Sequence, residues 1–332
     1  MSIRVGAIEL PNPVLLAPMS GVSDRPFRRL AKRFGAGLVV SEMVASHAIL
    51  HDVKSERQKA EIDSDDDIPV LQLAGWDPEM MAEAARMGEA RGAAIIDINM
   101  GCPAKNVVNK AAGSALMRDE PLAFRIIEAL VEAVKVPVTL KMRLGWDDLN
   151  RNAPVIAKRA EEIGVQLITI HGRTRCQMYK GQADWRAIRE IKDSVSVPLI
   201  ANGDICSIED AKKCLEFSGA DGVMIGRGAY GKPWIPGQIA DALMGREVRA
   251  EPTGSALSAI MQEHLDAMLS HYGFHHGLRN ARKHIGWYSQ GLENSAEFRR
   301  TVNNTMDPEI VFGAIEGFFG QSPSPLPDRK AA

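Results

Sequence analysis

Short apolar runs alternate with longer amphipathic segments through the first two thirds of the chain. Most of the runs lack the polar alternation of a half-exposed strand, which indicates strands that are buried on both faces. There are eight such runs: Val14–Pro18, Leu38–Glu42, Pro69–Ala74, Ile95–Met100, Val136–Arg143, Leu167–Gly172, Val197–Asn202 and Gly222–Gly226. The segments between them have the periodicity of helices, as in Asp77–Arg91, Pro121–Lys135, Ala153–Ile163 and Ser207–Phe217.

Strands that alternate with helices predict a parallel sheet. Eight such units within residues 1–245 fit the α/β class and a closed (β/α)₈ TIM barrel. An open doubly wound sheet is the structural alternative, but no GxGxxG sequence follows the first strand. The segment Ile3–Leu10 is suited to a small hairpin that closes the bottom of the barrel.

The pattern changes after about Arg246. The segment Glu251–Gly254 has the composition of a linker, and only helix-like segments follow it. These are Ser258–Tyr272, Leu278–Ser289, Ser295–Val302 and Pro308–Phe318. We therefore expect a small all-helical C-terminal domain over residues 246–320 and a flexible, proline-containing tail over residues 321–332.

Composition narrows the class of protein. The chain has 332 residues, 45% of them hydrophobic, and a formal net charge of −2, so any positive field for a nucleic acid must be local. No apolar run is long enough for a membrane span, and the N-terminus lacks the apolar core of a signal peptide. The four cysteines have neither CxxC pairing nor metal-ligand spacing. We expect a cytoplasmic monomer without disulfides or a bound metal.

Polar residues stand at the ends of several predicted strands, where the active sites of TIM barrels form. Gln72, Asn99, Lys141, His171 and Asn202 would be costly to bury without partners. Their recurrence at corresponding strand ends predicts one polar ligand ringed by the barrel.

The last two strands end in glycine turns, at the usual phosphate site of this fold. Asn202-Gly203-Asp204 and Gly226-Arg227-Gly228 offer backbone N–H groups and one guanidinium to phosphate oxygens. The alternative is that these glycines only permit tight turns. Their occurrence on both of the expected strands favours the phosphate site.

Lys141 lies inside a predicted strand, on the same side as Arg143 by the two-residue period. It is suited to act as a Schiff-base nucleophile or as a fixed positive charge beside a flavin. The structural alternative is an ion pair with a carboxylate such as that of Asp97.

Cys102 occupies a Gly-Cys-Pro turn at the end of a strand, which disfavours burial in the core. The long loop that follows, Ala104–Gly113, carries Lys105 and Lys110 and is suited to act as a lid.

The helical domain contains a basic segment that is followed by aromatic residues. We expect Arg279, Lys283 and Tyr288 to share one helix face, with Trp287 beside them. A basic helix with aromatic residues suits RNA phosphates and base stacking. The alternative is a solvated charged face with Trp287 in the core.

Several longer motifs resemble those of tRNA-dihydrouridine synthases, and most closely those of the bacterial B-type branch. The resemblance covers nearly the whole chain, and its most specific motif runs from Asn99 to Lys105. The others are Ala17–Met19, Ala112–Met117, Lys141–Gly145, Ile170–Arg175 and Ile200–Ile205.

The resemblance implies a bound FMN, reduced by NADPH or NADH. It places Pro18, Met19 and Ser20 at the flavin ring and Gln72 and Lys141 at the ring's polar edge. The ring edge, ribitol and phosphate would be held by His171, Asn202, Gly203, Asp204, Gly226 and Arg227.

The resemblance also implies the reaction: reduction of the C5=C6 bond of uridines in the D-loop or elbow region of tRNA. Hydride would pass from flavin N5 to C6, Cys102 would donate a proton to C5, and Asn99 would orient the uracil. Other predicted contacts with tRNA are Lys105, Lys110, Arg143, Arg173, Arg175, Arg279, Lys283, Trp287 and Tyr288.

Two other functions fit the same scaffold. One is an FMN enzyme that acts on a free small pyrimidine, against which the helical domain and the basic loops argue. The other is a non-catalytic RNA-binding protein, which would have no need of a proton donor such as Cys102.

Overall fold

The computed structural model describes residues 2–62 and 68–320, and the chain forms two compact units. The first contains the chain up to Gly228 together with Ile235–Val248, and the second contains Ala229–Trp234 and the chain from Arg249 on. The boundary expected from the sequence lay after residue 245, and the sequence did not reveal that residues 229–234 belong with the second unit. The predicted tail, 321–332, lies outside the described residues.

The first unit is built on a curved parallel sheet. Its strands are β3 (Val14–Leu16), β4 (Leu38–Val39), β5 (Val44–Ala45), β6 (Val70–Ala74), β7 (Ile95–Met100), β8 (Val138–Arg143), β9 (Ile168–His171), β10 (Leu199–Asn202) and β11 (Gly222–Ile225). Their order is β4-β3-β11-β10-β9-β8-β7-β6-β5. The second predicted strand, Leu38–Glu42, forms β4 and the bridge at Val40, and β5 follows it; β4 pairs with β3, while Val40 and β5 pair with β6. The ring therefore closes, which confirms the predicted barrel.

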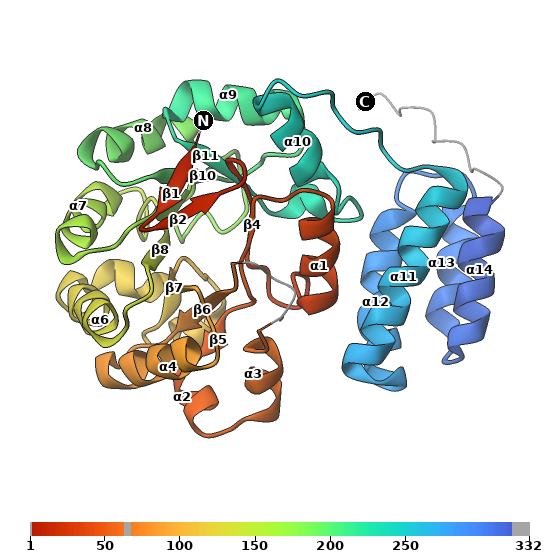
Figure 1. Cartoon of the computed structure of the whole chain (residues 1–332), viewed down its shortest axis with the longest axis horizontal. Helices are drawn as coiled ribbons and strands as arrows, with labels where there is room; N and C mark the ends of the chain where they lie inside the picture. The colour runs from red at the N-terminus through yellow and green to blue at the C-terminus, as the bar shows by residue number, and fades with distance from the viewer. Residues whose placement is uncertain (1, 63–67, 321–332) are drawn as a thin grey trace. The chain divides into compact units, whose positions relative to one another are not determined.

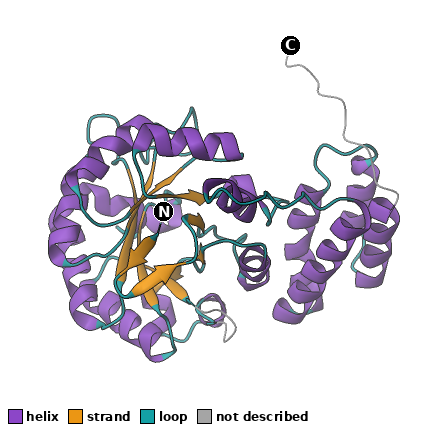
Figure 2. Cartoon of the chain, turned by 45° about the horizontal axis from the view of Figure 1, so that its top comes forward, coloured by secondary structure: helices purple, strands orange, loops and turns teal. Residues whose placement is uncertain are grey.

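Helices surround the barrel strands (Figure 2). They are α1 (Arg25–Arg33), α2 (Ser46–Leu50), α3 (Lys54–Lys59), α4 (Pro78–Ala90), α6 (Glu120–Ala133), α7 (Ala153–Ile163), α8 (Trp185–Ser194), α9 (Ile208–Ser218) and α10 (Ile235–Leu243). Side-chain caps determine where several of them begin. Asp77, Asp119 and Ser207 accept hydrogen bonds from the N–H groups of Met80, Leu122 and Asp210, respectively. The cap predicted at Ser207 is confirmed.

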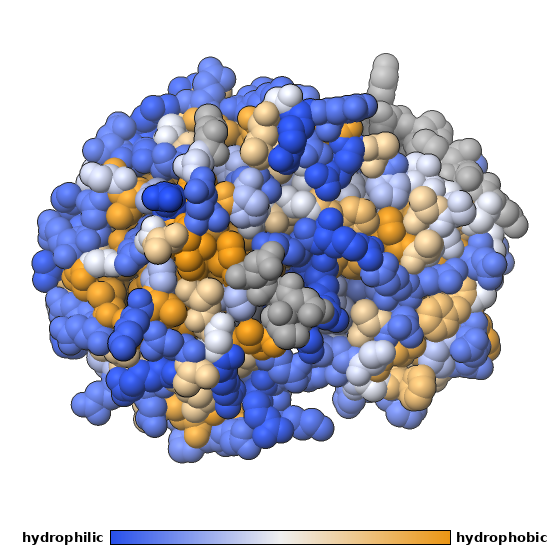
Figure 3. All heavy atoms as spheres, in the orientation of Figure 1, coloured by the Kyte–Doolittle hydropathy of each residue, from blue (hydrophilic) through white to orange (hydrophobic). Residues whose placement is uncertain are grey.

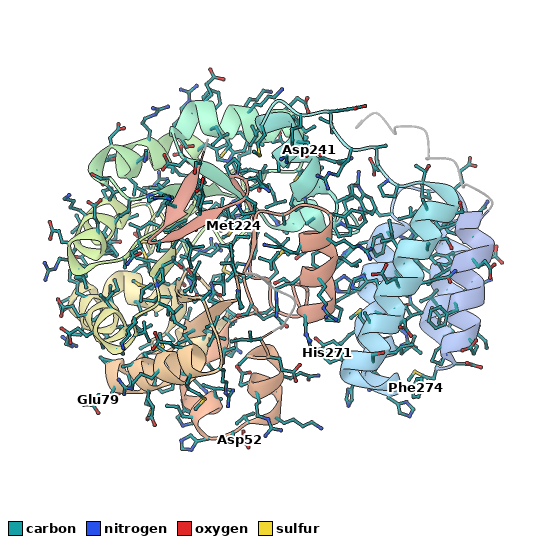
Figure 4. The ribbon with its side chains drawn as sticks, in the orientation of Figure 1. Asp52, Glu79, Met224, Asp241, His271 and Phe274 are labelled. Atoms are coloured by element: carbon teal, nitrogen blue, oxygen red, sulfur yellow. The ribbon has the colours of Figure 1, made fainter. Side chains whose placement is uncertain are left out.

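The predicted hairpin forms from β1 (Ile3–Val5) and β2 (Ile8–Leu10), an antiparallel pair drawn in red in Figure 1. Its apolar residues join a buried cluster made with residues of the barrel strands. The cluster is Ile3, Val5, Leu10, Leu15, Ala17, Leu38, Val40, Val70, Ile95, Leu167, Ile200 and Met224. Figure 4 labels Met224 in the middle of the barrel. Several of these residues begin their strands, so the hairpin closes the amino end and leaves the carboxyl end for a site.

The second unit is helical, as predicted. Its helices are α11 (Gly254–Tyr272), α12 (Phe274–Tyr288), α13 (Ser295–Asn304) and α14 (Pro308–Gly320). Gly273, with a φ of 77°, separates α11 from α12. Within this unit, Tyr230 stacks on Trp287 with ring centroids 4.0 Å apart, which shows how residues 229–234 pack with the helices.

Hydrophilic side chains dominate the face shown in Figure 3, with smaller apolar patches between them. None of the described helices combines the length and the apolar character that a membrane span requires.

Candidate active site

A chain of buried hydrogen bonds runs across β6, β7 and β8. The Asp97 carboxylate accepts from Thr139 Oγ1 at 2.6 Å and from Gln72 Nε2 at 2.6 Å. Gln72 Oε1 in turn accepts from Asn99 Nδ2 at 2.8 Å. The register of the sheet makes this possible, because Asp97 lies opposite Gln72 on one side and opposite Thr139 on the other. Burial raises the pKa of Asp97, while Gln72, Thr139 and Lys141 act to lower it.

This chain ends at the turn that carries Cys102. Asn99 Oδ1 accepts from the backbone N–H groups of Gly101 at 3.2 Å and Cys102 at 2.9 Å. On the other side, the N–H and hydroxyl of Ser114, in the 3₁₀ helix η1 (Gly113–Arg118), both donate to Cys102 O. Both sides of the turn are therefore fixed, and the half-buried thiol is held at the strand end.

Burial raises the pKa of the Cys102 thiol. The Ala104 N–H and the charges of Arg143 and Lys141 act to lower this pKa, but burial has the larger effect. The thiol therefore keeps its proton at neutral pH. A positioned, protonated thiol can act as a general acid.

Lys141 projects toward β10 rather than toward a carboxylate. Its Nζ donates to Asn202 Oδ1 at 3.1 Å, and Asn202 Nδ2 donates to Met224 O at 2.8 Å. Burial and then Arg143 lower the pKa of Lys141 to about 8, while Asp97 and Cys102 act to raise it. The carboxylate oxygens of Asp97 are bonded to Gln72 and Thr139, so the geometry favours a positioned cation over the ion pair considered from the sequence.

Arg143 ties two loops of the barrel mouth together. Its side chain is 1% exposed, with Nε donating to Gly101 O at 2.8 Å and Nη1 donating to Thr174 O and Met178 O at 3.1 and 2.9 Å. Burial lowers its pKa to about 10, so it stays charged at neutral pH. The residue predicted as a tRNA contact thus anchors the backbone on which Cys102 sits.

The turn after β10 is organised around Asp204, which has a φ of 54°. Its carboxylate accepts from Arg173, from Arg227 at 3.1 Å and from the N–H of Ala183 at 2.8 Å. Burial acts to raise the pKa of Asp204, but these donors, Arg173 first, bring it below its usual value. Asp204 thereby holds Arg227 at the predicted phosphate site.

Gly203 is required beside His171. Its φ is 121°, and an added Cβ would lie 2.8 Å from Ala183 Cβ and 2.9 Å from His171 Cδ2. Burial, followed by the charges of Arg143 and Lys141, lowers the pKa of His171 well below its usual value. The imidazole is therefore neutral, so one ring nitrogen donates a hydrogen bond and the other accepts one.

The other predicted cofactor residues lie at the same end of the barrel. Pro18 and Met19 are half-buried and Ser20 is exposed, directly after β3. An added Cβ on Gly226 would approach only Ala17 and Met19, each at 3.9 Å, which leaves open space beside this turn. Gln72, by contrast, is 0% exposed and bonded to Asp97 and Asn99.

Besides Arg143, two of the predicted tRNA contacts are buried in the protein. Arg173 is 1% exposed and its guanidinium is bonded to Asp204, Lys180 O and Gly181 O. Tyr288 is 6% exposed, and its hydroxyl lies 3.2 Å from His264 Nδ1. Nine residues separate Arg279 from Tyr288, or two and a half helical turns, so they face opposite sides of α12.

The remaining predicted contacts are accessible. Lys105 and Lys110 are exposed on α5 (Lys105–Val108) and the turn after it, where Lys110 Nζ lies 6.0 Å from the centroid of Trp76. Arg279 is exposed on α12, while Lys283 and Trp287 are half-buried on the same side.

Sequence reasoning missed Tyr179, an aromatic residue in the loop after β9. It is 51% exposed, and the guanidinium carbons of Arg143 and Arg227 lie 5.6 and 4.7 Å from its ring centroid. An aromatic residue in a basic loop at the mouth was the available signal.

Comparison with known families decides the family. The dihydrouridine synthase family model matches residues 15–315. The chain belongs to the dihydrouridine synthase family. It is 56% identical to a probable tRNA-dihydrouridine synthase of Rickettsia conorii over 96% of each chain. It is 48% identical to tRNA-dihydrouridine synthase B of Pseudomonas aeruginosa, again over 96% of each chain. The resemblance stated from the motifs is thus confirmed.

Among solved structures, this family member is similar to histamine dehydrogenase from Rhizobium sp. 4-9, with a TM-score of 0.56 and 12% identity. The match covers 80% of this chain and 50% of that one. At this identity the likeness concerns the fold alone.

The residues of the mouth fit a flavin mononucleotide. Lys141 and neutral His171 would offer a cation and a ring nitrogen to the polar edge of an isoalloxazine. Arg227 and the glycine turns after β10 and β11 would offer donors to a phosphate, and the space beside Gly226 would let that group approach the backbone.

Proposed function

We propose that this protein reduces the C5=C6 bond of D-loop uridines in tRNA to 5,6-dihydrouridine, with FMN as cofactor and NADPH as reductant. Family membership supports the reaction class. The observation that carries the proposal is the Cys102 turn, which holds a protonated thiol at the mouth beside Lys141 and Arg143. FMN, when bound, would supply the hydride for uracil C6, with NADPH as the source of its electrons.

The chain's own residues then have separate tasks. The C5=C6 bond is conjugated to the C4 carbonyl, so negative charge that develops after attack at C6 makes C5 the site of protonation. Cys102 donates that proton, and the resulting thiolate recovers one from solvent. Asn99 holds the backbone of Cys102 in place, because its Oδ1 accepts hydrogen bonds from the N–H groups of Gly101 and Cys102. Lys141 keeps a positive charge at the polar edge of the flavin.

The substrate base must leave its stack to reach the barrel, so the enzyme needs a grip on the RNA backbone. Lys105 and Lys110 follow β7 and Arg175 follows β9, on the carboxyl face of the barrel, and they supply part of that grip. On α12, Arg279, Lys283 and Trp287 follow the four-residue spacing of one helix face and supply a second part. We propose that the protein works on tRNA as a cytoplasmic monomer.

The test is dihydrouridine content, mapped by mass spectrometry of tRNA from cells with and without this gene. We expect loss at defined D-loop positions, restored by the wild-type gene and not by Cys102→Ala. In cells that have no second synthase for those positions, unchanged tRNA would overturn the proposal. Purified protein that reduces free uracil but not tRNA would instead establish the small-pyrimidine enzyme.

A further inference from the structure

Three side chains from three different loops form a stack at the mouth of the barrel. The Arg118 guanidinium carbon lies 4.0 Å from the ring centroid of Trp146, and that of Arg175 lies 4.6 Å from it. Arg118 ends η1, Trp146 follows β8, and Arg175 follows β9. Loops that follow barrel strands lie at the carboxyl face, so the stack is on the same face as Cys102.

The backbone beneath the stack is well fixed. The loops after β8 and β9 continue to pair beyond their strands, through Arg175 N to Gly145 O and Cys176 N to Trp146 O, both at 2.9 Å. Asn152 Nδ2 donates to Met117 O at 2.9 Å, which ties η1 to the β8 loop beside Arg118. The two guanidiniums are therefore held in place before any ligand arrives.

The charges of the stack are not used within the protein. Across residues 2–62 and 68–320, neither the Arg118 nor the Arg175 side chain has a hydrogen-bond acceptor or a carboxylate partner, and the buried Arg175 Nε is left without one. Nearby acidic groups have other roles: Asp119 caps α6, and Asp147 accepts from the N–H groups of Leu149 and Asn150.

Other arginines of this face differ. Arg151 pairs with Asp148 at 2.7 Å and with Asp184 at 3.3 Å, and both Arg173 and Arg227 pair with Asp204. Stacking on an aromatic ring leaves the N–H edges of a guanidinium free for an oxyanion. The stack therefore has the properties of an anion site rather than of a structural ion pair.

We propose that the Arg118–Trp146–Arg175 stack is a phosphodiester clamp that grips the tRNA backbone beside the base that enters the barrel. The inference rests on the proposed function and names a contact that it requires. A rigid pair of cations loses less side-chain entropy on binding than flexible lysines do. Each guanidinium that neutralises a phosphate also releases condensed counterions, so its removal has a signature in the salt dependence of binding.

The experiment measures the Kd for an unmodified tRNA transcript across a range of salt concentrations. The proteins are the wild type, Arg118→Gln, Arg175→Gln and the double variant, each carrying its flavin. The matched control is Arg151→Gln, which removes a neighbouring arginine whose charge is already paired. Bound flavin and the rate of NADPH oxidation without tRNA show that each barrel is intact.

We expect each single variant to reduce the slope of log K against log salt by about 0.7–0.9. The double variant should reduce it by about twice that amount, while Arg151→Gln should leave it unchanged. A double variant with the wild-type slope would overturn the clamp, as would an equal reduction in Arg151→Gln. If wild-type protein forms no dihydrouridine in tRNA, the proposed function itself fails, and the two failures are thereby distinguished.

Discussion

The barrel mouth has a floor of buried residues on the strands and a rim of residues in the loops that follow them. These two regions use polar residues in opposite ways. On the floor, Asp97, Gln72 and Asn99 are buried and bonded to one another, and buried Arg143 is bonded to three carbonyl groups. On the rim, Arg118 and Arg175 carry charges that no described group accepts.

The difference separates two tasks. A buried polar group that loses its partner costs about 1–3 kcal/mol, so a filled network resists displacement and keeps Cys102 in one place. A cation without an internal partner contributes little to the fold but remains available to a polyanion. Substitutions on the floor should therefore impair chemistry or stability, and substitutions on the rim should impair tRNA binding.

Cys102→Ala should have the largest effect. Without the proton donor, dihydrouridine formation at saturating tRNA should fall by about 10²–10⁴-fold, the usual contribution of a general acid. Bound flavin and the Kd for tRNA should stay close to wild type, because Asn99 bonds the backbone of residue 102 and not its side chain. Single-turnover rates with a tRNA transcript measure the effect.

The matched control is Cys206→Ala, which removes an exposed thiol just beyond the end of β10. It should turn over as the wild type does. Equal rates for the Cys102 and Cys206 variants would show that another group supplies the proton.

The second prediction contrasts two neighbouring arginines in the loop after β9. Arg173→Gln leaves Asp204, which is about a quarter exposed, without its main partner and should lower the free energy of unfolding by about 2–3 kcal/mol. Arg175→Gln loses one cation–π contact and should lower it by about 0.5–1 kcal/mol. Urea unfolding of the purified proteins measures both. Equal losses of unfolding free energy in the two variants would contradict the distinction between floor and rim.

The sequence predicted the barrel because eight buried strands leave a strong pattern, and it predicted a site at the strand ends because barrel chemistry lies there. Side-chain partners were harder to predict. Gln72 was assigned to the cofactor, but the register places it opposite Asp97, and that contact is set by the pairing of β6 with β7. The Arg118–Trp146–Arg175 stack joins three loops whose spatial proximity no local pattern encodes. Tyr288 shows that the helix face of a residue depends on the number of helical turns that separate it from the residues it is compared with.

The third prediction concerns Lys141, the cation of the floor. Its pKa of about 8 means that the charge is present below that pH and is lost as the pH rises through it. The Kd for FMN should therefore increase above about pH 8, by up to about tenfold per pH unit if only the charged form binds. Quenching of flavin fluorescence measures the Kd without any turnover.

Lys141→Arg supplies the control for this pH dependence, because a guanidinium stays charged across the same range. Its Kd for FMN should not begin to rise near pH 8. A rise that persists in this variant would assign the titration to another group.

The smallest effect is expected on the rim at α5, where Lys105 and Lys110 are exposed. Lys105→Gln and Lys110→Gln should each raise the KM for tRNA only about two- to fivefold at physiological salt, because flexible lysines lose side-chain entropy when they hold a phosphate. The rate at saturating tRNA should not change, since neither residue supports the Cys102 turn. Lowering the salt concentration should widen the fold difference in KM from the wild type, because the wild type makes one more phosphate contact and its binding depends more steeply on salt. A fall in the saturating rate would instead show that α5 helps to form the active site, and the division between floor and rim would have to be redrawn there.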